Sequence, residues 1–139
     1  MAERANKENE AREVLIRLKY IEGQMASIQN QLSMFEKGLM EISGTKVSLE
    51  SLKALSKDSN SLLPLGSGLF AKGLLLKQDK VLVEVGAGAI VEKDLVDAGK
   101  ILDTREKDIR TNILTFQQAL VNLEGEYNSL SDKARSLVG

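Results

Sequence analysis

The sequence contains no cysteine and no histidine among its 139 residues. These absences exclude disulfide frameworks, thiolate or imidazole metal ligands, cysteine nucleophiles and the side chain most often used for proton transfer near neutral pH. Tryptophan is also missing, and only three phenylalanines and two tyrosines are present. A thick core built on large aromatic side chains is therefore not expected, whereas a seam between helices needs only aliphatic side chains.

The charges nearly cancel, because 19 basic residues against 20 acidic ones leave a net charge of −1. Such a balance provides no positive field to gather phosphates or an anionic membrane, so neither nucleic acid nor a membrane is expected as a partner. The first ten residues are polar, and no later run approaches the roughly 18 apolar residues of a membrane span. We therefore expect a soluble, cytoplasmic protein.

A heptad pattern of apolar residues runs without interruption from Val14 to Ile42. Its steps alternate between four and three residues, and mostly polar side chains lie between them, which predicts a coiled-coil helix over about residues 8–57. The pattern changes after Ile42, where Gly44 favours a kink or a weak turn and Lys46 occupies the next seam position.

A second heptad pattern runs from Leu102 to Leu137 and predicts a helix over residues 94–138, with Asp94 as its N-cap. Only Glu106 interrupts the spacing. It is an exposed edge, a register device or a partner for a lysine on the other helix. The similar lengths of the two predicted helices favour antiparallel pairing within one chain.

Residues 62–92 alternate short apolar runs with glycine-rich or polar connections, which predicts two successive β-hairpins. Pro64 favours an edge position for the first strand. The predicted fold is therefore mainly α with a small β region, a long antiparallel coiled-coil hairpin whose helices are connected by two β-hairpins in a single unit. The expected strands cover residues 62–65, 69–76, 81–85 and 89–92.

Four short strands with open edges and no second layer are marginal alone, so we expect this region to drive oligomerisation. Its candidate residues for subunit assembly are Leu63, Leu65, Leu69, Phe70, Leu74, Leu75, Leu76, Val81, Val83, Val85, Ile90 and Val91.

Two glycine motifs resemble nucleotide-binding loops but lack the necessary residues. Residues 86–91 begin like a dinucleotide loop, yet Val91 replaces the third glycine. Residues 68–75 have phosphate-loop glycine spacing, yet Leu74 and Leu75 stand where lysine and serine or threonine are needed. Both motifs are better explained as turns with positive φ, so we expect no cofactor, no metal, no catalytic residues and no enzyme activity.

Both ends of the paired helices carry more apolar residues than a two-stranded seam can bury. Leu15 and Ile16 flank Val14, and Val138 follows Leu137. These side chains either pack locally against the opposite helix or form an exposed, adhesive tip.

The segments LLPLGSGLFAKG at 62–73 and VLVEVGAGAIVEKD at 81–94, between two heptad helices, resemble the alpha class of the prefoldin family. The segment LESLK at 49–53 is also similar to that family. The resemblance implies a hexamer of two alpha and four beta subunits whose hairpins join in a β platform. It further implies that unfolded client proteins are held at the helix tips without ATP and delivered to a group II chaperonin.

On this interpretation the candidate client-binding residues are Val14, Leu15, Ile16, Leu18, Leu130, Leu137 and Val138. An alternative hypothesis is a structural coiled-coil protein that self-assembles into filaments or rings through its β-hairpins. A small-molecule enzyme is a distant third.

Overall fold

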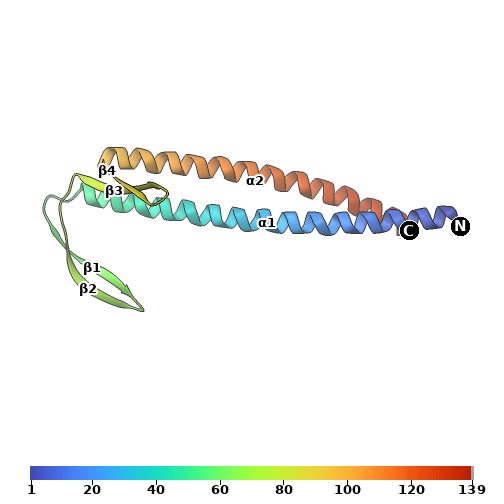
Figure 1. Ribbon diagram of the computed structural model, residues 1–139, viewed down its shortest axis with the longest axis horizontal. Coiled ribbons are helices and arrows are strands. Elements are labelled where there is room, and N and C mark those ends of the chain that lie inside the picture. Colours follow the sequence, from blue (N-terminus) through green and yellow to red (C-terminus); the bar gives the residue numbers. More distant parts are fainter. Residues whose placement is uncertain (139) are drawn as a thin grey trace. The chain divides into compact units, whose positions relative to one another are not determined.

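The computed structural model describes residues 1–138 and contains two long helices connected by two β-hairpins (Figure 1), which confirms the predicted fold class. The chain divides into a first unit, residues 1–38 with those from 108 onward, and a second unit, residues 39–107. The elements in chain order are α1 (Ala2–Lys53), β1 (Ser59–Gly66), β2 (Leu69–Leu75), β3 (Lys80–Gly86), β4 (Ala89–Asp94) and α2 (Leu95–Val138).

In the first unit α1 and α2 pair antiparallel along the predicted seam. Val14, Leu18 and Ile21 are buried, with 5%, 9% and 0% of their surfaces exposed. Further along, the ring centroids of Phe35 and Phe116 lie 5.3 Å apart, a tilted aromatic contact across the seam. The helix pair is therefore held by aliphatic and phenylalanine side chains, as the heptad spacing predicts.

Helix α1 is longer at its start and shorter at its end than the expected range of 8–57. It passes Gly44 without interruption, so the weak turn expected there is absent. The hydroxyl groups of Thr45 and Ser48 donate to carbonyl oxygens one turn earlier, within the helix. The helix ends at Lys53, and the amide of Leu55 closes a tighter turn by donating to Leu52 O at 3.3 Å.

Helix α2 begins at the predicted cap. The Asp94 carboxylate accepts a 2.7 Å hydrogen bond from the amide of Asp97, which satisfies one of the free amides of the first turn. Asp94 is also the last residue of β4, so the second hairpin leads directly into the helix.

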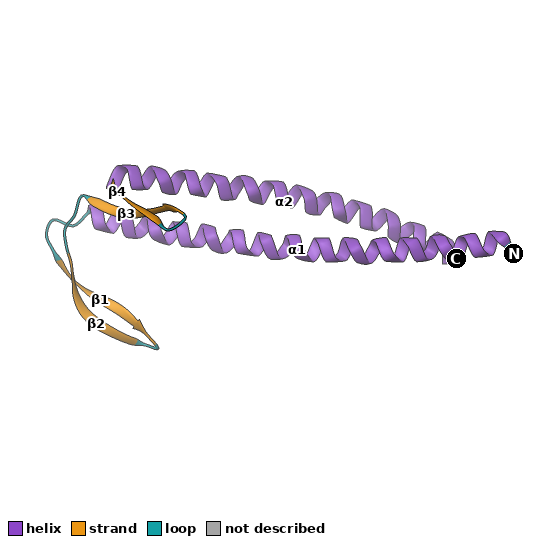
Figure 2. Cartoon of the chain, in the orientation of Figure 1, coloured by secondary structure: helices purple, strands orange, loops and turns teal. Residues whose placement is uncertain are grey.

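The two hairpins form separate two-stranded antiparallel sheets (Figure 2). They share one turn geometry. Gly66, Ser67 and Gly68 have φ values of 105°, 50° and 80°, and residues 86–88 repeat this pattern with 122°, 49° and 76°. This left-handed backbone favours glycine, and it confirms the turns predicted at Gly68, Gly86 and Gly88. The prediction is wrong for Gly73, which has no positive φ and lies in β2 opposite Ser61.

The second hairpin packs on the helices of its own unit. The amide of Leu95 donates to Asp79 O at 3.2 Å, and Arg105 Nη2 donates to Glu84 O at 2.6 Å. Between β3 and the helices lies a mostly apolar cavity of about 310 Å³, lined by residues that include Leu49, Leu52, Val81, Val83, Ala98, Ile101 and Leu102.

No helix within residues 1–138 has a stretch both long enough and apolar enough to cross a membrane.

Candidate assembly and client-binding surfaces

The first hairpin carries apolar side chains on both of its faces. Leu63 lies opposite Ala71 and Pro64 lies opposite Phe70, and successive residues of a strand point to opposite faces. Leu63 and Phe70 are 53% and 60% exposed. The large apolar side chains exposed in this hairpin are Leu62, Leu63, Leu65, Leu69, Phe70, Leu74 and Leu75, followed by Leu76 in the connection.

A two-stranded sheet with two apolar faces has no layer of its own to cover either of them. Its outer edges also present backbone amides and carbonyls that no neighbouring strand pairs within residues 1–138. These two properties fit the predicted assembly surface, which stays a prediction.

The second hairpin differs because its two faces have different surroundings. Val83 lies opposite Val91, and both are half-buried. The adjacent positions Leu82 and Ile90 are 73% and 62% exposed. Val81 and Val83 line the cavity between β3 and the helices of the same chain. Their predicted role in subunit assembly stays a prediction.

Sequence reasoning missed Leu62 and Leu82 as exposed apolar residues of the hairpins. The signal was present, because Leu62 and Leu63, like Leu82 and Val83, are consecutive apolar residues in a strand. Consecutive apolar residues place apolar surface on both faces of a hairpin.

The structure divides the predicted client-binding residues into three groups by their exposure. Leu15, Ile16 and Val138 are 55%, 70% and 83% exposed, so the extra apolar residues at the helix ends are not absorbed by local packing. Val14 and Leu18 are buried in the seam, and a client can reach them only if the helices separate. The other two residues of the prediction, Leu130 and Leu137, are half-buried.

Tyr20 extends the exposed apolar surface by one helical turn beyond Ile16, and sequence reasoning missed it. Its side chain is 56% exposed, and the Arg17 guanidinium lies 5.2 Å from the centroid of its ring. The four-residue spacing from Ile16 was the available signal.

Polar contacts tie the two helices together beside this surface. Arg17 donates to Glu126 Oε1 through Nε at 3.0 Å and Nη2 at 2.8 Å. The next residue of α2, Tyr127, donates its hydroxyl to Glu22 Oε1 at 2.9 Å. Because both contacts cross the seam, they oppose separation of the helices at this level.

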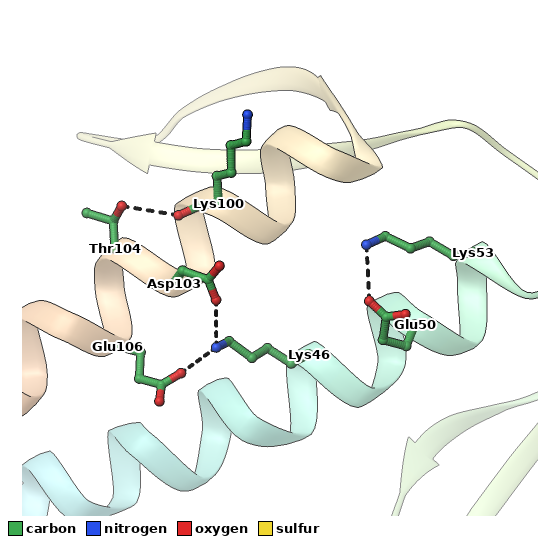
Figure 3. Close-up of polar contacts among 7 residues, drawn as sticks. All are labelled: Lys46, Glu50, Lys53, Lys100, Asp103, Thr104 and Glu106. Carbon is green, nitrogen blue, oxygen red and sulfur yellow. Dashed lines mark hydrogen bonds and ion pairs between the residues drawn. The ribbon is translucent and has the colours of Figure 1, made fainter.

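The two polar interruptions of the seam face each other in the second unit (Figure 3). Lys46 Nζ donates to Asp103 Oδ1 at 2.7 Å and also to Glu106. Of the three alternatives for Glu106, the structure confirms the partner for a lysine on the other helix. The hydrogen bond to Asp103, followed by that to Glu106, raises the pKa of Lys46 above its ordinary value.

Stability at alkaline pH is expected to depend on Lys46 and Tyr127. The hydrogen bond to Glu22 raises the pKa of Tyr127, as the carboxylates raise that of Lys46. At a pH between the unfolded-state and folded-state pKa values, the folded chain therefore keeps both protons, whereas the unfolded chain loses them. Their contribution is complete below the ordinary values of 10.0 and 10.5, and it is lost as pH rises through the higher folded-state values.

Urea unfolding midpoints measured between about pH 9 and about pH 12 test this dependence. The midpoint should fall with pH, and it should fall less steeply in the double variant Lys46→Met/Tyr127→Phe. Tyr20→Phe is the matched control, because the Tyr20 hydroxyl accepts a hydrogen bond from Gln24 on the same helix and not from the facing one among residues 1–138. If the urea midpoint of the double variant falls with pH as steeply as that of the unmodified chain, Lys46 and Tyr127 do not cause the dependence.

Two paired antiparallel helices connected by two β-hairpins with exposed apolar side chains make this a coiled-coil protein with a small β region. Comparison with known proteins identifies its family. Residues 21–139 match the family model described as "Prefoldin subunit". The chain therefore belongs to the prefoldin family.

Several archaeal relatives are named prefoldin subunit alpha, which confirms the resemblance to the alpha class. The relative from Thermoplasma acidophilum is 29% identical over 120 residues, 86% of this chain and 92% of its own length. Those from Methanoregula boonei and Thermococcus onnurineus are 33% and 35% identical, over 80% and 71% of this chain and 72% and 71% of their own lengths.

A cryo-EM structure of filamentous PFD from Methanocaldococcus jannaschii shares the fold. It aligns with a TM-score of 0.74 at 23% sequence identity, over 88% of this chain and 98% of that one. The family and its alpha-subunit relatives support a chaperone subunit.

Proposed function

We propose that this chain is a non-enzymatic, ATP-independent holding chaperone subunit of the cytoplasm. It acts as a single prefoldin-like unit that combines with beta-class subunits, two alpha with four beta. It captures unfolded proteins at the ends of its coiled coil and delivers them to a group II chaperonin. No cofactor, metal, nucleic acid or membrane takes part.

The observation that carries the proposal is the first hairpin, whose apolar side chains are exposed on both faces beside unpaired strand edges. Such a surface is stable in water only when another chain covers it and extends the sheet. Strands of further prefoldin-family subunits supply both the backbone partners and the apolar layer.

Client capture is assigned to Leu15, Ile16 and Val138, with Tyr20 beside them. These side chains are more than half exposed, and three of them lie within two turns of α1. Unfolded proteins expose apolar segments of many sequences, and an apolar surface binds them without reading sequence. Several weak contacts on several subunits hold a client through avidity while each contact remains reversible.

Suppression of client aggregation is expected to be equal with and without ATP. Residues 86–88 form a hairpin turn and residues 69–75 form strand β2, in which Leu74 and Leu75 stand where a phosphate loop needs its lysine and hydroxyl group. Light scattering from a denatured client, diluted into the assembled subunits with ATP or with buffer alone, measures the difference. Saturable ATP binding at micromolar concentration would contradict this prediction.

A second candidate function is self-assembly into filaments or rings through the hairpins. It is favoured by the open edges of both sheets and by the filamentous relative of similar fold. Electron microscopy of the purified chain over a range of concentrations distinguishes the two candidates. Filaments that lengthen with concentration in the absence of a beta-class subunit support self-assembly, whereas the proposed chaperone subunit requires its partner.

A further inference from the structure

We propose that Gly23 and Gly125 form a paired hinge in the two-helix arm of the first unit. About this hinge the terminal segment, residues 2–22 of α1 with 126–138 of α2, swings as one packed body. The hinge goes beyond the proposed function, and its existence can be tested whether or not the chain binds clients.

Contacts across the seam place the two glycines at the same level. Glu22 contacts Tyr127 on one side, and Phe35 contacts Phe116 on the other. In an antiparallel pair one residue number rises as the other falls. Gly23 follows Glu22 by one residue on α1 and Gly125 precedes Tyr127 by two residues on α2, so the two glycines lie within about one helical turn of the same level.

Packing does not account for either glycine. A Cβ atom built at Gly23 or Gly125 meets nothing within 4 Å, and neither residue has a positive φ. Gly38 is different, because a Cβ atom there lies 3.3 Å from Ile109 Cδ1 on the facing helix. The two open positions therefore weaken both helices without allowing a closer approach between them.

The pairing of the glycines distinguishes this level from other weak points. A pair of packed helices bends easily only if both helices are weakened at the same level. If one helix alone is weakened, the intact helix beside it keeps the pair straight. Gly44 in the second unit also faces open space, but the Lys46–Asp103 contact places Thr104 and Arg105 near its level on α2. Glycine is a common site of bending in helices.

The segments on either side of the paired glycines are well packed. On the terminal side Val14, Leu18 and Ile21 are buried, and Arg17 joins the helices through its contact with Glu126. On the other side the Phe35 and Phe116 rings lie in contact. The next seam residue after Gly23 is Met25, whose unbranched side chain can repack as the angle changes.

A hinge at this level moves the exposed side chains of Leu15, Ile16 and Val138 together. The seam beneath them stays closed, because bending occurs beyond the buried residues rather than between the helices. Clients of different sizes then meet an apolar surface that changes its direction while keeping its own structure.

The test measures a distance that spans the hinge in the full-length chain. The sequence has no cysteine, so Glu13→Cys and Ser33→Cys, both at exposed positions, allow two nitroxide labels on α1 about 30 Å apart. Pulsed electron paramagnetic resonance reports the distribution of this distance. The distribution should be broad, and in the double variant Gly23→Ala/Gly125→Ala its width should fall by roughly half.

The matched control is Ser27→Ala/Ser129→Ala, which raises helix propensity at two exposed positions but leaves both glycines in place. Its distribution should remain as broad as that of the labelled parent chain. Circular dichroism confirms that all variants keep their helices. A parent distribution already as narrow as that of the double alanine variant overturns the hinge, and full narrowing by Gly23→Ala alone overturns the pairing.

Discussion

Deleting residues 59–94 and joining the helices through a flexible linker is expected to abolish assembly completely and to leave a helical monomer. The deletion removes both sheets, their open edges and the exposed apolar side chains of the hairpins. The seam of α1 and α2 supplies its own partners, so helicity should persist. Native mass spectrometry with a beta-class subunit, together with circular dichroism, measures both results.

Point substitutions test the same surface without removing backbone. Leu65 and Phe70 are 67% and 60% exposed, and replacing each with serine should weaken assembly by about 1–2 kcal/mol. Val47→Ser is the matched control, because Val47 is 67% exposed but lies on α1. Assembly that survives the deletion, or that is weakened equally by Val47→Ser, would place the interface on the helices instead.

The triple variant Leu15→Gln, Ile16→Gln and Val138→Gln is expected to lose most client protection while its assembly remains intact. These side chains are exposed, so their replacement leaves the buried seam residues in place. Each apolar contact contributes on the order of 1–2 kcal/mol when a client covers it. Loss of three contacts on each of several subunits is multiplied through avidity. Aggregation of a denatured client, followed by light scattering, measures the protection.

Two control variants make this result specific. Met34→Gln with Leu114→Gln removes apolar surface of similar exposure, 64% and 68%, from the same unit but far along both helices from the chain termini. Deletion of residues 2–10 removes the polar start of α1, which begins beyond the end of α2 (Figure 1). Both controls should keep protection. If the triple variant protects clients as well as they do, the binding surface lies elsewhere.

Heptad spacing was sufficient to predict the helices and their seam, because burial of one helical face requires apolar residues at these intervals. It also identified Lys46 and Glu106 as the polar residues at seam positions, and the structure pairs them across the seam. The hairpin turns were equally readable, since left-handed backbone at residues 66–68 and 86–88 favours glycine. Local rules of this kind depend on few neighbours.

Features that depend on tertiary contacts were harder to predict from the sequence. Alternation shows that Val83 and Leu82 point to opposite faces, but only the position of β3 on the helices shows that Val83 lines the cavity while Leu82 is exposed. The ends of α1 also differed from expectation, because polar residues such as those at 2–7 continue a helix without any apolar signal.

Co-expression with a beta-class prefoldin subunit, followed by native mass spectrometry, tests the central claim most directly. The proposed function predicts one dominant species containing two copies of this chain and four of its partner, which disappears when residues 59–94 are deleted. A chain that forms no mixed species at any ratio of the two subunits, or whose mixed species survives that deletion, would contradict it.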